Sequence, residues 1–344
     1  MKYKPFLSWE VNREMIIRSH KNFGLMLSIF CILGLISCGG GGSGGDSVIV
    51  PTEPTGLTYT GVDTPAVIDL SNAVELTGDA FMGGETGTNL GMLSSVTDSQ
   101  PNILREVKLY KLVPIFGGAL NKIDFNSYQG DSLTVQTEQD AVVGDCGGSA
   151  SYTATMDDVT GTFTGSMNFT DYCSQNTSIS GTADFSGKFN VDNSGFLNFA
   201  LSINMVSLTS GNQSYVIDGD ISVDVSGPST IASLDIVMKD SSNEVFWVND
   251  YLLTITQGMD YVDLQVSGRF YHPTHGYVNL TTITPVRTYN IYQWPSSGEL
   301  QVAGGASTTA RLLVIDENYC QIIADTNGDG NYNYDSGHMY WNDL

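Results

Sequence analysis

The stretch Leu197-Asn198-Phe199-Ala200-Leu201-Ser202-Ile203-Asn204-Met205 decides the fold. Its odd-numbered residues are large and apolar, whereas its even-numbered residues are small or polar. Successive side chains of a β-strand point to opposite faces of a sheet, so a period of two places one face on a core and the other in water. The stretch therefore predicts a half-buried β-strand.

The same alternation recurs in about a dozen segments on both sides of this stretch. Clear examples lie in 183–191, 221–225 and 262–270, and turns rich in glycine, serine and asparagine separate them. Consecutive segments of this kind are typical of antiparallel hairpins. The sequence thus predicts a mainly β protein with a large antiparallel meander over 119–344. A sandwich, a closed barrel and a curved sheet covered by N-terminal helices would each bury its apolar face.

The turn at 192–196 joins the stretch quoted above to the alternating segment before it. A register that places Phe189 opposite Phe199 also places Phe185 opposite Ile203. Apolar side chains of both strands then share one face, which is what stabilises a hairpin. We expect this register in the structure.

Cys146 and Cys173 flank two further alternating segments. A register that places these cysteines opposite each other also places Tyr152 opposite Met167 on one apolar face. We therefore predict a disulfide between Cys146 and Cys173, which fits an oxidising compartment. Such a bridge contributes ~3–4 kcal/mol by restricting the unfolded chain. Cys320 is then left as a small buried hydrophobe.

Residues 71–115 lack the alternation and predict helices. Ser71 followed by Glu75 is typical of an N-cap with a carboxylate in the first helical turn. Gly83-Gly84 predicts the end of this helix, and Pro101 suits the first position of a second helix.

Residues 1–37 have the pattern of a bacterial export signal. A basic region precedes Phe23–Ser37, an uncharged and mostly apolar run that is short for a membrane span. The run ends in Leu35-Ile36-Ser37-Cys38, which resembles a bacterial lipobox, a signal whose cysteine is acylated and becomes the first mature residue. We expect Cys38 to carry a lipid that binds the membrane; the alternative is an ordinary N-terminal membrane anchor.

Residues 38–56 are rich in glycine, serine and proline and predict a flexible tether. Position 39 is glycine rather than aspartate, and this pattern resembles that of lipoproteins sent to the outer membrane. A first strand is expected near 57–60, at the start of a single large β-rich domain over 57–344. We expect this domain to be anchored to the outer membrane, on its periplasmic side or on the cell surface.

The charge balance limits the partners. The first 37 residues contain five of the 14 basic and two of the 37 acidic residues, which leaves a net charge of −26 on the mature chain. A charge this negative argues against nucleic acid and anionic lipid surfaces as partners.

The strongest ligand-binding motif runs from Asp325 to Asp335, Asp-Thr-Asn-Gly-Asp-Gly-Asn-Tyr-Asn-Tyr-Asp. Oxygen-bearing side chains at alternate positions with glycine sixth resemble the first half of a calcium loop. Ser336 replaces the usual glutamate, and the flanks resemble strands, so calcium would brace a C-terminal hairpin. The alternative is a turn with solvated carboxylates. The candidate calcium ligands are Asp325, Asn327, Asp329, Asn331, Asn333 and Asp335.

His272-Pro-Thr-His275 is a second candidate, because two histidines three residues apart can ligate zinc or copper. No cysteine or further histidine is tied to them in the sequence. The favoured interpretation is an exposed turn after a strand.

No catalytic motif is evident in the sequence. It has no Gly-x-Ser-x-Gly in a strand-turn-helix context, no phosphate-binding loop and no dinucleotide fingerprint. Trp247, Trp294 and Trp341 could form a glycan platform, but they are more typical of core and rim aromatics of a sheet.

Several short motifs are spread along the chain: Leu57–Gly61, Pro65-Ala66, Asn72-Ala73, Cys146–Gly148, Tyr172-Cys173, Ser267–Tyr271, Trp294–Gly298 and the loop from Asp325. Together they resemble a group of uncharacterised β-rich lipoproteins from delta-class proteobacteria. The resemblance covers nearly the whole mature chain and implies a lipid-anchored address and a β-rich build, with no activity and no functional residues.

These observations predict a non-catalytic, lipid-anchored lipoprotein of the envelope or cell surface that acts as a binding or structural module, with an envelope protein as partner. The alternative is a carrier of a lipid or other apolar ligand within a curved sheet, with the helices as a lid. A hydrolase whose site is assembled from distant residues is the least favoured function.

Overall fold

The computed structural model describes residues 56–91, 135–157, 159–174, 176–189, 196–210, 213–226 and 229–344. The predicted export signal, Cys38, the predicted tether before residue 56 and the helix expected at Pro101 lie outside the described residues.

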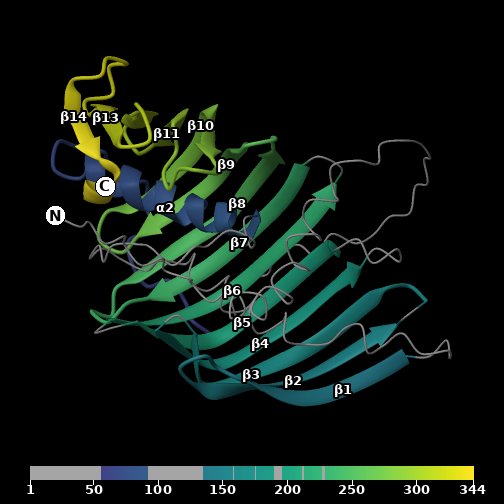
Figure 1. Cartoon of the computed structure of the whole chain (residues 1–344). Coiled ribbons are helices and arrows are strands. Elements are labelled where there is room, and N and C mark those ends of the chain that lie inside the picture. The colour runs from purple at the N-terminus through teal and green to yellow at the C-terminus, as the bar shows by residue number, and fades with distance from the viewer. Residues whose placement is uncertain are drawn as a thin grey trace, which may run out of the picture.

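The described strands form one antiparallel sheet of 14 strands, in which the order in space is the order in the chain (Figure 1). The first and last of these strands do not pair with each other, so the sheet is open and strongly curved. The predicted antiparallel meander is confirmed. Its strands are β1 (Val135–Val143), β2 (Gly147–Asp157), β3 (Thr162–Ser174), β4 (Thr177–Phe189), β5 (Phe196–Ser210), β6 (Gln213–Ser226), β7 (Ser229–Lys239), β8 (Val245–Gln257), β9 (Tyr261–His272), β10 (Gly276–Tyr289), β11 (Ser297–Ala303), β12 (Thr309–Val314), β13 (Tyr319–Asp325) and β14 (Tyr334–Tyr340).

The stretch that predicted the fold lies in β5, and its alternation breaks at one residue. Leu201 and Ile203 are buried, as expected, but Met205 is exposed and has a φ of 50°. A β-bulge between Ile203 and Val206 adds one residue to the strand, so the inward positions change from odd to even and Val206 becomes buried.

Similar bulges recur in β3 at Asp171 and in β8 at Asp250, both with positive φ. A bulge leaves a backbone amide without a ladder partner, and a side chain of the next strand supplies one. The Asp171 amide donates to Ser180 Oγ at 2.9 Å, and the Met205 amide donates to the Asp218 carboxylate. The bulge in β5 therefore accounts for the buried carboxylate of Asp218.

The predicted disulfide between Cys146 and Cys173 is present, with a Cα–Cα distance of 5.1 Å. Tyr152 pairs with Met167 as predicted. A one-residue shift near the bridge places Gly147, rather than Cys146, opposite Cys173. Cys320 is fully buried, as expected for a small hydrophobe.

The register predicted for the next hairpin is wrong by two residues. Phe185 pairs with Leu201, and Ala183 pairs with Ile203. A shift of two residues leaves every side chain on its original face, so the apolar pattern satisfies both registers equally.

The α-helix α2 (Ala73–Gly91) covers the part of the inner face formed by β7 to β13, and a short 3-10 helix, η4 (Trp341–Asp343), follows β14 (Figure 1). It begins after Asp69, whose Oδ1 accepts hydrogen bonds from the amides of Ser71 and Asn72 at 2.7 and 3.1 Å. Ser71 is therefore not the cap, because the side chain of Asp69, two residues earlier, accepts the hydrogen bonds of these amides.

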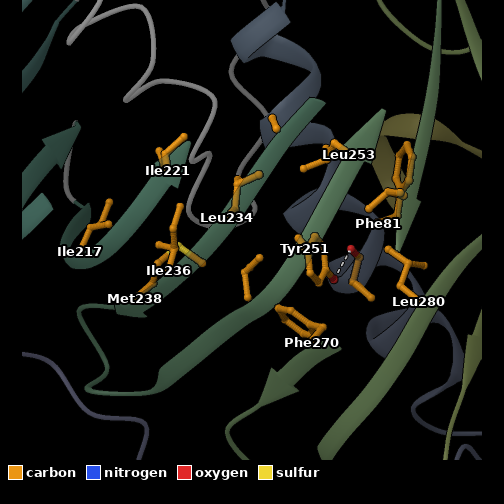
Figure 2. Close-up of a cluster of buried hydrophobic side chains, with 14 of the residues drawn as sticks. Phe81, Ile217, Ile221, Leu234, Ile236, Met238, Tyr251, Leu253, Phe270 and Leu280 are labelled. Atoms are coloured by element: carbon orange, nitrogen blue, oxygen red, sulfur yellow. Dashed lines mark hydrogen bonds between the residues drawn. The ribbon is translucent and has the colours of Figure 1, made fainter. Parts of the chain in front are cut away.

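The helix also continues through Gly83-Gly84, where its end was predicted. A Cβ on Gly83 would lie 3.1 Å from Val248 Cγ2 of β8, so glycine serves close packing here. Beside it, the buried Tyr251 hydroxyl donates to the Ala80 carbonyl oxygen at 2.9 Å (dashed line in Figure 2). Among the described helices, none is long and apolar enough to cross a membrane.

The segment before α2 crosses the outer face of the sheet, the face opposite the helix. Leu57 packs there on Val237 and Val245, and its amide donates to Asp218 Oδ2 at 3.0 Å. Residues 57–60 form no strand, which corrects the prediction. The chain then passes the β9–β10 turn, where the Val62 amide donates to the Pro273 carbonyl oxygen, and enters the helix on the inner face.

Candidate metal centre

Four potential metal-ligating side chains meet where the start of α2 lies against the β9–β10 turn. His272 is the last residue of β9, His275 precedes β10, and the first turns of α2 bring in Glu75 and Asp79. His272 Nε2 lies 3.5 Å from Glu75 Oε1 and 3.7 Å from Asp79 Oδ2. His275 Nε2 lies 3.1 Å from Glu75 Oε2. Ligand atoms of Glu75, His272 and His275 all lie within 4.8 Å of one another, a spacing that could hold a metal ion.

His272 is the buried member of this cluster. Its side chain is 6 % exposed, compared with 29 % for His275 and 51 % for Glu75. The Phe246 ring lies nearly perpendicular to the imidazole, with ring centroids 5.4 Å apart and an interplanar angle of 87°. Burial, followed by the charge of the neighbouring His275, lowers the pKa of His272 to about 4. The ring is therefore neutral at pH 7, with one nitrogen protonated and the other carrying a lone pair that can accept a hydrogen bond or bind a metal.

Thr274 determines the orientation of the His272 ring. Its amide lies 3.3 Å and its hydroxyl oxygen 3.1 Å from Nδ1. An amide can only donate, so Nδ1 is the acceptor in this arrangement and the proton of the neutral ring is on Nε2. Nε2 points at the carboxylates of Glu75 and Asp79.

The sequence indicated the two histidines as possible ligands, but it did not indicate the carboxylates that lie beside them. Glu75 lies 200 residues before His275 in the chain. The favoured interpretation, an exposed turn, is wrong for His272, because the start of α2 lies against this residue and buries it, whereas Thr274 in the same turn is exposed. The signal present in the sequence was the His-x-x-His spacing alone.

The first half of the Asp325 loop folds around its own carboxylate. Asp325 is buried; its Oδ1 accepts from the amides of Asn327, Gly328 and Asp329, and its Oδ2 accepts from the Gly330 amide at 2.7 Å. Asn327 Nδ2 donates to Asp329 Oδ2 at 3.1 Å. Asp325, Asn327 and Asp329 are thus brought together.

The second half of the loop makes other contacts. The Asn331 amide donates to Asp329 Oδ1 and, with Asn327, lowers the pKa of that carboxyl. Asn333 Oδ1 accepts from Thr326, and Asp335 Oδ1 accepts from Gln321 Nε2 at 2.6 Å. These bonds satisfy the loop internally and are those of a tight turn. Calcium binding by the six residues stays a prediction.

The three tryptophans do not form one platform. Trp247 stacks on Tyr271 of the outer face, with ring centroids 4.6 Å apart. Trp294 stacks on Trp341, which is buried beside Phe81 of α2. They are rim and core aromatics, as the sequence favoured.

Comparisons with known proteins found no match: no family model, no curated protein and no solved structure is similar to the chain at a significant level. The resemblance to lipoproteins of delta-class proteobacteria therefore stays a prediction.

Proposed function

We propose that the protein is a non-catalytic, lipid-anchored envelope lipoprotein that acts as a binding or structural module. The observation that carries this proposal is the disulfide between Cys146 and Cys173. Disulfides of this structural kind persist in oxidising compartments outside the cytoplasm. This agrees with the independent lipobox-like motif that ends at Cys38.

The architecture of the described residues supports a structural or binding role. The described residues form mainly one broad sheet with a single layer of helix on part of its inner face. The outer face carries acidic and hydroxyl side chains, such as Asp184, Asp220 and Ser222, and suits contact with water or with a protein partner.

The carrier alternative gains no support from the hollow over the first strands. A hollow of about 570 Å³ lies over β1 to β3, and its lining is largely polar, with Gln139, Asp140, Ser151, Thr153, Ser166 and Asn168. Sites for small ligands are usually lined mainly by apolar side chains, so this hollow does not favour an apolar ligand. A lipid retained in native mass spectrometry of the purified protein would support the carrier instead.

Anchoring is tested by replacing Cys38 with serine in the native host. We expect the wild-type protein in the membrane fraction with the mass of an acylated chain, and we expect Cys38→Ser to lose both. Cys31→Ser is the matched control, because Cys31 lies in the apolar run before the motif and should leave lipidation intact. A wild-type chain that is soluble and unmodified would refute the anchor.

The non-catalytic role needs a separate test, because the Glu75–His272–His275 cluster places histidines beside carboxylates. The mature protein should show no turnover of model esters, phosphoesters or peptides above background. Turnover that disappears in His275→Gln would contradict the proposal and support the hydrolase.

A further inference from the structure

We propose that Glu75, Asp79, His272 and His275 bind one Zn²⁺ ion, which fastens the start of α2 to the β9–β10 turn. This proposal deepens the binding role proposed above by naming a ligand class. It does not depend on lipidation, since the cluster belongs to the folded part of the chain.

The donor set matches zinc in type. Two imidazole nitrogens with carboxylate oxygens are common zinc ligands, whereas magnesium and calcium prefer oxygen alone. Two carboxylates also balance the charge of one divalent ion when both imidazoles are neutral, so little net charge would be buried.

The spacing of the donors also suits zinc. Ligand atoms at about 2.0–2.1 Å in a tetrahedron are separated by about 3.3–3.4 Å. The contacts of His272 Nε2 with Glu75 Oε1 and Asp79 Oδ2 are 3.5 and 3.7 Å, and that of His275 Nε2 with Glu75 Oε2 is 3.1 Å. Ligand atoms of Glu75, His272 and His275 already lie within 4.8 Å of one another, and Asp79 approaches this set at His272.

Zinc binding requires the other tautomer of the His272 ring. To bind through Nε2, the imidazole must move its proton to Nδ1, and the Thr274 amide must then give up its hydrogen bond to Nδ1. The Thr274 hydroxyl oxygen, 3.1 Å from Nδ1, can accept a hydrogen bond from the moved proton. The Thr274 hydroxyl can therefore serve as a partner of Nδ1 in either tautomer.

An ion here would join parts of the fold that are far apart in the chain. Glu75 and Asp79 lie on α2, and the histidines lie about 200 residues later on the sheet. Zinc that binds only the docked arrangement would stabilise the docked helix.

The test uses the full mature chain, purified without a histidine tag, which would itself bind the probe, and treated with a chelator before dialysis. Zn²⁺ is titrated by calorimetry and by its effect on Tm, with Mg²⁺ as the hard-cation control. We expect one Zn²⁺ per chain and a rise in Tm that Mg²⁺ does not reproduce. Co²⁺ in place of Zn²⁺ should give the visible absorption of a tetrahedral nitrogen–oxygen site.

His275→Gln and Glu75→Gln are the test variants, because both side chains are partly exposed and their loss leaves the core intact. Each should weaken Zn²⁺ binding more than about tenfold, since even a change in the residues that support a ligand costs that much. His338→Gln and Glu244→Gln are the matched controls, because both residues are exposed and lie on other strands or turns, and these variants should bind as the wild type does.

The absence of saturable binding at one equivalent, or unchanged binding in His275→Gln, would overturn the proposal. The cluster would then be a hydrogen-bonded contact between helix and turn. Zinc binding by a chain that fails to become lipidated would leave this inference standing and refute only the anchor. A lipidated chain that binds no zinc would do the reverse.

Discussion

Removal of the disulfide should loosen one end of the sheet far more than the other. Each strand pairs only with its neighbours in the chain, so the sheet is held together locally, as in a repeat protein. The bridge between Cys146 and Cys173 joins the turn before β2 to β3 near the β1 end, whereas α2 contacts β7 to β13. The double variant Cys146→Ala/Cys173→Ala is the perturbation.

The magnitude follows from the length of the closed loop. The cysteines are 27 residues apart, and loop-closure entropy for this length corresponds to about 3.6 kcal/mol at 25 °C. Each 1.36 kcal/mol is a factor of ten in an equilibrium, so local opening of β2 and β3 should become about 400-fold more frequent.

Hydrogen exchange followed by mass spectrometry measures this effect strand by strand. Amides of β2 and β3 should lose protection in the double variant, and amides of β8 and β9 should keep theirs. A reductant is the control, since it should reproduce the loss in the wild type and change nothing further in the variant. Equal loss across all strands would refute the local character of the sheet, and unchanged protection of β2 and β3 would refute the contribution of the bridge.

The remaining predictions concern buried side chains and are measured by urea unfolding. Tyr251→Phe removes the hydrogen bond to the Ala80 carbonyl oxygen and should cost about 1 kcal/mol; no loss would show that the helix is held by packing alone. Gly268→Ala should cost more than Gly330→Ala: both have positive φ, but a Cβ at Gly268 would lie 2.4 Å from Tyr251 Cδ1, whereas Gly330 has open space. Burial raises the pKa of Asp235 above 3.8, so the folded state binds this proton more tightly than the unfolded chain does. That contribution to stability is complete below about pH 3.8 and is lost as pH rises through the folded pKa; Asp235→Asn should remove this slope, and an identical slope in both proteins would contradict the assignment.

The alternation of apolar residues predicted the class, the meander and the faces of the strands. Val262, Leu264 and Val266 are buried as their period of two required. The pairing of Cys146 with Cys173 was also predictable from the sequence, because the disulfide and the apolar face of one hairpin require nearly the same register. These features depend on neighbours along the chain.

The bulges and the helix boundaries were not predictable in the same way. Met205 follows the apolar pattern, yet it is exposed because a bulge shifts the face at that residue. Glycine at position 83 predicted the end of the helix. Only the close approach of Val248 shows why a glycine lies inside the helix there. A register shifted by two residues likewise satisfies every local rule.

The sequence by itself determined that the chain forms consecutive antiparallel hairpins with one apolar face, because side-chain period and turn composition are local properties. Only the tertiary structure decided that the described strands form one open curved sheet, that α2 lies on its inner face, and that Glu75 and Asp79 meet His272 and His275. The reason is physical: contacts between segments about 200 residues apart depend on how the chain wraps around the end of the sheet, and no local pattern records that path.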